Sequence, residues 1–118
     1  MNLKRVVVTG LGALTPIGNN KDDYWKNLLK GKSGCAPITY FNTEHFKTKF
    51  ACELKNYNVS DFFDRKEARK TDKFAQYAIV ASTEAISDAN LNLDKIDKFR
   101  VGVISVSYTH LRAHETLL

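Results

Sequence analysis

Residues 5–20 read RVVVTGLGALTPIGNN, a β-branched run that leads into a glycine-rich loop. The run from Arg5 to Thr9 predicts a short buried strand, because valine and threonine favour extended backbone. The loop contains three glycines and one proline, which predicts an ordered turn with unusual backbone angles. This stretch therefore indicates the beginning of an α/β fold.

The spacing of the glycines argues against a nucleotide-binding loop. The dinucleotide pattern G-x-G-x-x-G would need glycine or alanine at position 15, which is Thr15. Pro16 also stands where the phosphate-binding helix would already be running. A nucleotide-binding oxidoreductase is disfavoured, and we interpret the loop as a tight structural turn.

The sequence predicts a first helix directly after this loop. Asn20 can cap it, and Asp22 and Asp23 in its first turn favour the positive end of the helix dipole. Gly31 or Gly34 ends it. Its apolar side chains share one face, and they are Tyr24, Trp25, Leu28 and Leu29.

A longer helix and a second strand complete the predicted pattern. Residues 35–60 are mostly loop, with a strand near residues 49–54. The helix runs from residue 71 or 72 to Asn90, and residues 100–104 form a second buried strand. Alanines recur along the helix at three- and four-residue spacing, so one face can pack closely; they are Ala78, Ala81, Ala85 and Ala89. The order predicts an α/β protein with a sheet covered by helices.

Positive charge is concentrated between residues 65 and 73. The chain of 118 residues has a net charge of +5, and this stretch holds five basic and two acidic side chains. In a continuous helix Lys66, Arg69, Lys70 and Lys73 would share one face. Such a face attracts nucleic acid, an anionic lipid surface or an acidic protein. The alternative is an ordinary solvated face.

Two aromatic residues beside the basic stretch, Phe74 and Tyr77, fall on an apolar helix face. We interpret them as core residues rather than as platforms on which nucleic-acid bases stack. The sequence contains no apolar run long enough to span a bilayer. We therefore expect neither a nucleic acid nor a membrane as the partner.

The cysteines and histidines predict neither a metal centre nor a nucleophile. Cys35 and Cys52 lie seventeen positions apart, which indicates no disulfide framework and no metal-ligand spacing. We interpret both as small buried hydrophobic residues, and a reducing cytoplasm fits this usage. His45 is expected to be exposed in a polar loop. His110 and His114 are four positions apart, but no glutamate follows the first as a zinc-protease motif requires.

The last part of the chain has a different character. Residues 106–116 read VSYTHLRAHET, which resembles a translation of adapter DNA used in preparing sequencing libraries. We therefore expect a boundary near residue 104. Residues 1–104 would form the native portion and residues 105–118 a foreign tail, in which the paired histidines are accidental.

Four stretches together resemble one family. They are RVVVTGLGALTPIGN (5–19), DYWKNLLKGKSG (23–34), TKFACELKNYN (48–58) and RKEARKTDKFAQYAIVASTEAISDANL (65–91). Their order and spacing are similar to the beginning of the type II β-ketoacyl-[acyl-carrier-protein] synthases. The resemblance covers about residues 3–104 and implies a truncated N-terminal part of a layered α/β/α, thiolase-like fold.

The resemblance also implies an activity. Enzymes of this family are cytoplasmic homodimers that elongate acyl-[acyl-carrier-protein] with malonyl-[acyl-carrier-protein] in fatty acid biosynthesis, without a metal or other cofactor. A cysteine thiolate takes the acyl chain as a thioester, and the carbanion left by decarboxylation attacks it. Two histidines stabilise the enolate and the oxyanion. None of these catalytic residues matches Cys35, Cys52 or His45, so we expect the chain itself to be inactive.

One functional element of the family matches residues of this chain. The resemblance implies that Lys66, Arg69 and Lys70 dock the acidic acyl-carrier protein. The alternative from another class is a small basic binding module, complete in itself, that contacts an acidic protein or nucleic acid. A coding frame that continues beyond residue 118 would favour the enzyme.

Overall fold

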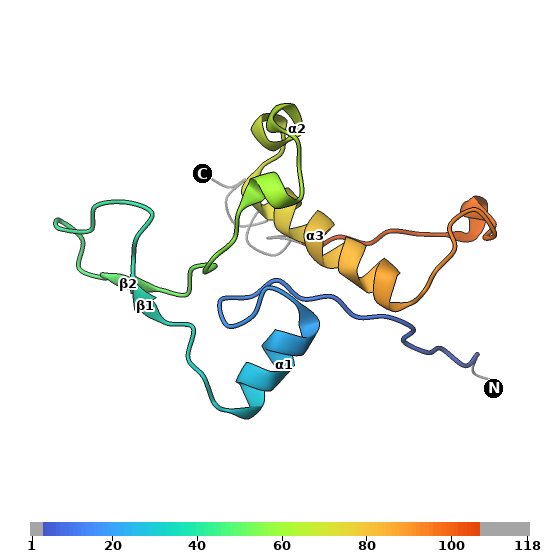
Figure 1. Ribbon diagram of the computed structural model, residues 1–118, viewed down its shortest axis with the longest axis horizontal. Helices are drawn as coiled ribbons and strands as arrows, with labels where there is room; N and C mark the ends of the chain where they lie inside the picture. Colours follow the sequence, from blue (N-terminus) through green and yellow to red (C-terminus); the bar gives the residue numbers. More distant parts are fainter. Residues whose placement is uncertain (1–3, 107–118) are drawn as a thin grey trace, which may run out of the picture.

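Helix α3 (Lys73–Asp88) lies at the centre of the arrangement, and the other segments contact it or extend away from it (Figure 1). The computed structural model describes residues 4–106. The remaining elements are the helices α1 (Lys21–Leu29) and α2 (Arg65–Lys70), the strands β1 (Ala36–Pro37) and β2 (Phe50–Ala51), and the 3-10 turns η1 (Val59–Asp61) and η2 (Lys98–Arg100).

Helix α1 has the ends that the sequence predicts. The Asn20 side chain accepts a hydrogen bond from the Asp23 amide at 2.8 Å, which satisfies one free donor of the first turn. At the other end Gly31 adopts a φ of 65°, a left-handed conformation that glycine takes at little cost. The amide of Lys32 then donates to the Asn27 carbonyl at 3.0 Å, and the helix closes as a Schellman motif.

Helix α3 ends in the same way but with asparagine. Asn90 has a φ of 49°, and the Leu91 amide donates to the Ile86 carbonyl at 3.3 Å. Asparagine is the residue other than glycine that most often takes this conformation. The predicted end of the helix at Asn90 and Leu91 is therefore confirmed.

The loop at residues 10–18 needs its glycines for close packing. The prediction of unusual backbone angles there was wrong, because the positive φ values within residues 4–106 occur at Gly31, Asn56 and Asn90. A Cβ atom on Gly12 would instead collide with the carbonyl oxygen of Ala81 and lie 2.8 Å from the Ala85 nitrogen. The predicted alanine face of α3 thus lets the loop backbone approach closely.

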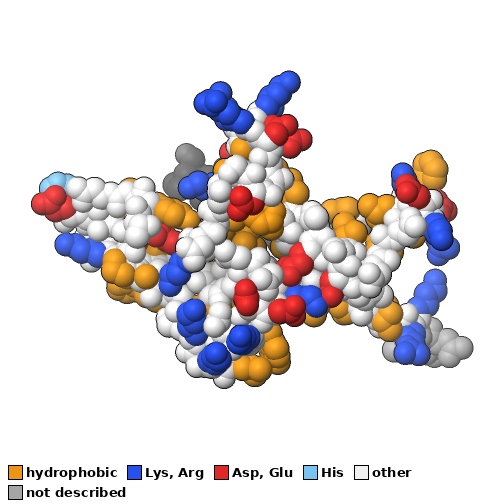
Figure 2. Space-filling view, viewed as in Figure 1, with side chains coloured by type: hydrophobic (Ala, Val, Ile, Leu, Met, Phe, Trp, Pro, Cys, Tyr) orange, Lys and Arg blue, Asp and Glu red, His pale blue; other side chains and the backbone are white. Residues whose placement is uncertain are grey.

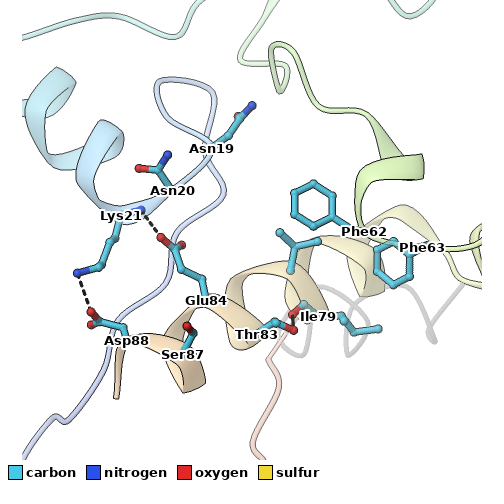
Figure 3. A pocket seen from close by; sticks show the side chains of 11 residues that line it. Asn19, Asn20, Lys21, Phe62, Phe63, Ile79, Thr83, Glu84, Ser87 and Asp88 are labelled. Atoms are coloured by element: carbon cyan, nitrogen blue, oxygen red, sulfur yellow. Dashed lines mark hydrogen bonds and ion pairs between the residues drawn. The ribbon is translucent and has the colours of Figure 1, made fainter. Parts of the chain in front are cut away.

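The same loop is held by two carboxylates of α3. Glu84 accepts hydrogen bonds from the amides of Ala13 at 2.8 Å and Lys21 at 2.9 Å. One turn further on, Asp88 accepts from the Leu11 amide at 2.9 Å and pairs with Lys21 Nζ at 2.7 Å (Figure 3). The start of α1 is thereby fixed against the last two turns of α3.

The two buried strands that the sequence predicts at residues 5–9 and 100–104 do not form in the described part of the chain. Residues 5–9 and 100–104 run without a strand partner, and the turn η2 overlaps the start of the second segment. Both segments are open to solvent, since Val6 is 89% exposed and Val103 is 88% exposed. A strand is stable only beside another strand, and these two segments do not pair. The strand predicted near residues 49–54 is present as the short β2.

The part of the chain that the structure describes buries little surface. Val80 and Gln76 are its buried residues, at 7% and 6% exposure. The accessible surface is 10674 Å², against about 6,500 Å² for a compact protein of this size. The radius of gyration is 17.9 Å, whereas a compact chain of this length would have a radius of about 13.5 Å. Large apolar side chains such as Trp25 therefore remain uncovered.

Candidate functional site

Helix α2 presents the predicted basic residues on one side. Its six residues are RKEARK, and the Asp64 side chain caps the helix by accepting from the amides of Lys66 at 2.8 Å and Glu67 at 2.7 Å. Lys66, Arg69 and Lys70 are all exposed. Figure 2 shows Lys and Arg side chains projecting from the end of the molecule where α2 lies, at the top of the view. We call these three residues the basic triad.

Lys73 does not belong to this group, because the stretch is not the continuous helix in which all four basic residues would share one face. Helix α2 ends at Lys70, and Thr71 and Asp72 adopt extended backbone before α3 begins. The break redirects the chain, and the Lys73 ammonium lies 4.5 Å from the centre of the Tyr40 ring. Lys73 thus makes a cation–π contact with the loop after β1 instead of extending the triad.

Gln76 fixes the direction of α2. Its side-chain nitrogen donates to the carbonyls of Ala68 at 3.1 Å and Thr71 at 2.8 Å, and both oxygens belong to the end of α2. The side-chain oxygen in turn accepts from the Tyr57 hydroxyl at 3.4 Å. Gln76 is 6% exposed, so these bonds satisfy a polar group that would be costly to bury alone.

Aromatic contacts support this junction. The Tyr57 ring stacks on Phe62 at 5.8 Å between ring centres and meets Tyr77 edge-on at 5.3 Å. Burial raises the pKa of the Tyr57 and Tyr77 phenols. Tyr77 is partly buried, as predicted, but Phe74 is 55% exposed, so the prediction that Phe74 is a core residue was wrong. Phe74 lines an open hollow with Val103 and Ser105, and these residues leave its ring largely uncovered.

The electrostatics of α2 favour an external anion. Among residues 4–106 the ion pairs join Lys21 to Asp22 and to Asp88, so none involves the basic triad. Three cations thus face solvent on a helix that Asp64 caps at its start and Gln76 holds at its end. Nor does the described part contain a group of histidine, cysteine and acidic side chains that could hold a metal ion.

The other candidate residues lie elsewhere. Cys35 and Cys52 are both exposed, which contradicts their interpretation as buried hydrophobic residues. The reason is that they flank a short hairpin with no layer packed over it. His45 is exposed, as predicted. His110 and His114 lie outside the described residues.

A hollow of about 490 Å³ lies between α3 and the start of α1, away from the basic triad (Figure 3). Phe62, Phe63 and Ile79 form its apolar wall, and Thr83 and Ser87 also line it. Neither cysteine nor histidine reaches it, and its two carboxylates, Glu84 and Asp88, are engaged with backbone amides. Its lining therefore offers no free nucleophile with an adjacent base.

Comparison with known proteins assigns the chain to a family. The family described as "Beta-ketoacyl synthase, N-terminal domain" matches residues 3–117. The chain belongs to the β-ketoacyl synthase family. The matched range runs past residue 104, and the expected foreign origin of residues 105–118 stays a prediction.

Curated members of the β-ketoacyl synthase family are close in sequence. The chain is 51% identical over 100 residues to 3-oxoacyl-[acyl-carrier-protein] synthase 2 of Staphylococcus aureus (strain COL), which covers 85% of the chain and 24% of that protein. It is 46% identical over 101 residues to the Synechocystis protein of the same name, and the match covers 86% of this chain and 24% of that protein. The chain therefore spans about a quarter of the length of these relatives.

Solved structures agree on the fold. The structure titled "The ishigamide ketosynthase/chain length factor" gives a TM-score of 0.68 at 33% identity, over 76% of this chain and 22% of that one. A ketosynthase in complex with a type II polyketide acyl-carrier protein gives a TM-score of 0.55 at 24% identity. The match covers 77% of this chain and 23% of that one. The chain has the N-terminal part of the α/β, thiolase-like fold. Within residues 4–106, no helix has the length and apolar character needed to cross a membrane.

Proposed function

We propose that this chain is the N-terminal portion of a condensing enzyme that elongates acyl-[acyl-carrier-protein] with malonyl-[acyl-carrier-protein] in fatty acid biosynthesis. The observation that carries the proposal is 51% identity over 100 residues to a 3-oxoacyl-[acyl-carrier-protein] synthase 2. The whole enzyme would be a cytoplasmic homodimer that needs no cofactor. A thiolase-like fold agrees with this chemistry.

We propose further that the described residues contribute to docking rather than to catalysis. The cysteines are exposed beside a two-stranded hairpin, and His45 is exposed in the loop between the strands. Neither location brings a thiol and an imidazole together in an enclosed pocket, which acyl transfer by a cysteine requires. The acylated cysteine and the two histidines would come from the rest of the enzyme.

In this proposal the basic triad recognises the acyl-carrier protein. Lys66, Arg69 and Lys70 are exposed and unpaired within the described part of the chain, and Gln76 holds their helix in a fixed direction. Exposed cations steer an acidic partner and set its orientation, while each ion pair contributes little energy. A structure with a similar fold is a ketosynthase bound to its acyl-carrier protein, which agrees with such a partner.

The test uses a complete β-ketoacyl synthase that carries residues 1–104 as its N-terminal segment. Reversing two charges of the triad, with Arg69→Glu and Lys70→Glu, should raise KM for carrier-bound acyl substrate about tenfold at low salt. Acyl transfer from a small thioester without the carrier protein should change little. The difference between wild type and variant should shrink as salt screens the charges.

The matched control reverses two exposed lysines on a different helix. The variant Lys26→Glu with Lys30→Glu changes the last turn and the C-cap of α1; it has the same change in net charge but leaves α2 intact. It should keep the wild-type KM for carrier-bound substrate. Equal losses on both substrates in the α2 variant would mean that the triad is structural. A complete protein with no condensing activity on either substrate would refute the enzyme and favour a basic binding module.

A further inference from the structure

The two cysteines lie one position beyond the last pair of the β1–β2 hairpin, where its register would set them opposite each other. In the antiparallel register Ala36 pairs with Ala51 and Pro37 with Phe50, so the next pair outward is Cys35 and Cys52. The hairpin projects away from the helices, at the left of Figure 1. The sixteen residues between the two cysteines thus fold into a hairpin that brings the second cysteine back toward the first.

The hydrogen-bond pattern identifies the type of pair. The Ile38 amide donates to the Lys49 carbonyl at 3.0 Å, and hydrogen-bonded and non-hydrogen-bonded pairs alternate along an antiparallel ladder. Counting outward from this bond and continuing the ladder by one position, Cys35 and Cys52 would form a non-hydrogen-bonded pair. The Cys35 amide accordingly donates to Ser33 Oγ at 3.2 Å instead of to β2.

Both geometry and exposure suit a covalent link between the two thiols. Cα atoms in a non-hydrogen-bonded pair lie about 4.5 Å apart, inside the range of about 4.4–6.8 Å that disulfides span. Side chains of facing residues lie on the same side of the ladder. Pro37 and Phe50, two positions further along that side, are also exposed, so a small oxidant can reach the thiols.

We propose that Cys35 and Cys52 are a reversible dithiol–disulfide pair whose oxidant is a small-molecule disulfide. A thiolate of the pair attacks one sulfur of that disulfide, whose S–S bond breaks and releases one small thiolate. The second cysteine, as thiolate, then attacks the mixed disulfide, forms the Sγ–Sγ bond and expels the other small thiolate. The protein loses two electrons and two protons, and the oxidant becomes two thiols.

Oxidation would fix the hairpin in its observed register. Glu53, next to Cys52, accepts hydrogen bonds from the Thr39 amide at 3.0 Å and the Thr39 hydroxyl at 2.8 Å. The next residue, Tyr40, makes a cation–π contact with the Lys73 ammonium. The disulfide would therefore tie together the segment that contacts the first residue of α3. An exposed pair of this kind stays reduced in a reducing compartment and responds when the thiol–disulfide balance shifts.

The test equilibrates the full 118-residue chain with mixtures of reduced and oxidised glutathione, in buffer and in concentrated urea. In buffer both free thiols should disappear together, without bound glutathione. Trypsin should then leave residues 33–47 and 50–55 joined by one disulfide, because Lys32, Lys47, Lys49 and Lys55 provide the cleavage sites. The effective concentration of one thiol at the other should be at least about tenfold higher in buffer than in urea.

The control shifts one thiol by a single residue. Ala51→Cys combined with Cys52→Ser keeps two cysteines but moves the second to the opposite side of the ladder. Its effective concentration in buffer should fall at least about tenfold. Equal values for this variant and the wild type would overturn the proposal, as would equal values in buffer and urea. Two mixed glutathione disulfides or chains linked to each other, in place of the internal bond, would also overturn it.

Discussion

Glu84 and Asp88 lie one turn apart on α3, and together they accept hydrogen bonds from the backbone amides of Leu11, Ala13 and Lys21. Glu84 uses a different oxygen for each of its two donors. A carboxylate suits this position because it is an acceptor at both oxygens. The segment from residue 11 to residue 21 is therefore held by two carboxylate side chains of α3.

Glu84→Gln should loosen this segment. The glutamine carboxamide has one acceptor oxygen in place of two, so either the Ala13 or the Lys21 amide loses its partner. The expected cost is about 1–3 kcal/mol, visible as faster hydrogen exchange at these two amides. The isosteric change at exposed Glu67, Glu67→Gln, should leave both rates unchanged. Unaltered exchange in Glu84→Gln would show that Glu84 does not hold the segment.

The Lys21–Asp88 pair predicts a defined pH range. The hydrogen bond from Lys21 lowers the pKa of Asp88 below its ordinary 3.8, and Asp88 raises the pKa of Lys21 above 10.5. The Asp88 contribution is therefore complete above pH 3.8 and is lost as the pH falls through the lowered pKa. The Lys21 contribution is complete below pH 10.5 and is lost as the pH rises through the raised pKa.

Fluorescence of Trp25, the single tryptophan, can follow this dependence because its side chain and Leu11, Gly12 and Ala13 line one hollow. The Trp25 fluorescence should stay constant between pH 3.8 and pH 10.5, and it should change below and above this range. In Asp88→Asn the acid transition should have a smaller amplitude, since the asparagine does not titrate. An acid transition of unchanged amplitude in that variant would assign it to other carboxylates.

Gly12→Ala should displace the N-terminal loop from α3. The added methyl group would collide with the Ala81 carbonyl oxygen, which is part of the helix backbone and cannot move aside cheaply. Overpacking of this kind costs about 1–3 kcal/mol. Gly102→Ala is the matched control, because no atom lies within 4 Å of its added Cβ. Equal unfolding free energies for both variants would contradict the close approach.

Gln76→Leu should release α2 from α3. Leucine has nearly the same size but cannot donate to the carbonyls of Ala68 and Thr71, so two acceptors lose their partner at a cost of about 1–3 kcal/mol. Backbone chemical shifts of residues 65–70 should move toward random-coil values. Ser82→Ala, on the exposed side of α3, should leave them in place. A helical α2 in the leucine variant would show that the amide bonds are dispensable.

Sequence patterns predicted those features that depend on neighbouring residues. The cap at Asn20 and the helix ends at Gly31 and Asn90 follow from local backbone chemistry, and all three are present. The strands at residues 5–9 and 100–104 depend on partner strands, which a periodic pattern cannot supply.

The candidate site was predictable to a similar degree. Lys66, Arg69 and Lys70 lie together because their spacing is local. Gln76 escaped notice because a polar residue in a helix is usually solvated, and nothing in the sequence marks it as buried. Asp72 before an apolar periodic run was the available signal for a new helix start, and it separates Lys73 from the triad.

The contacts made by Glu84 and Asp88 also bear on which substitutions the protein tolerates. Three of the four partners are main-chain N–H groups, which every residue except proline carries. Leu11 and Ala13 can therefore be exchanged for many other residues without loss of these bonds, while proline at either position would remove one. Within this loop, sequence variation among related chains should accordingly concentrate at Leu11 and Ala13, and the two acidic residues on α3 should stay the same.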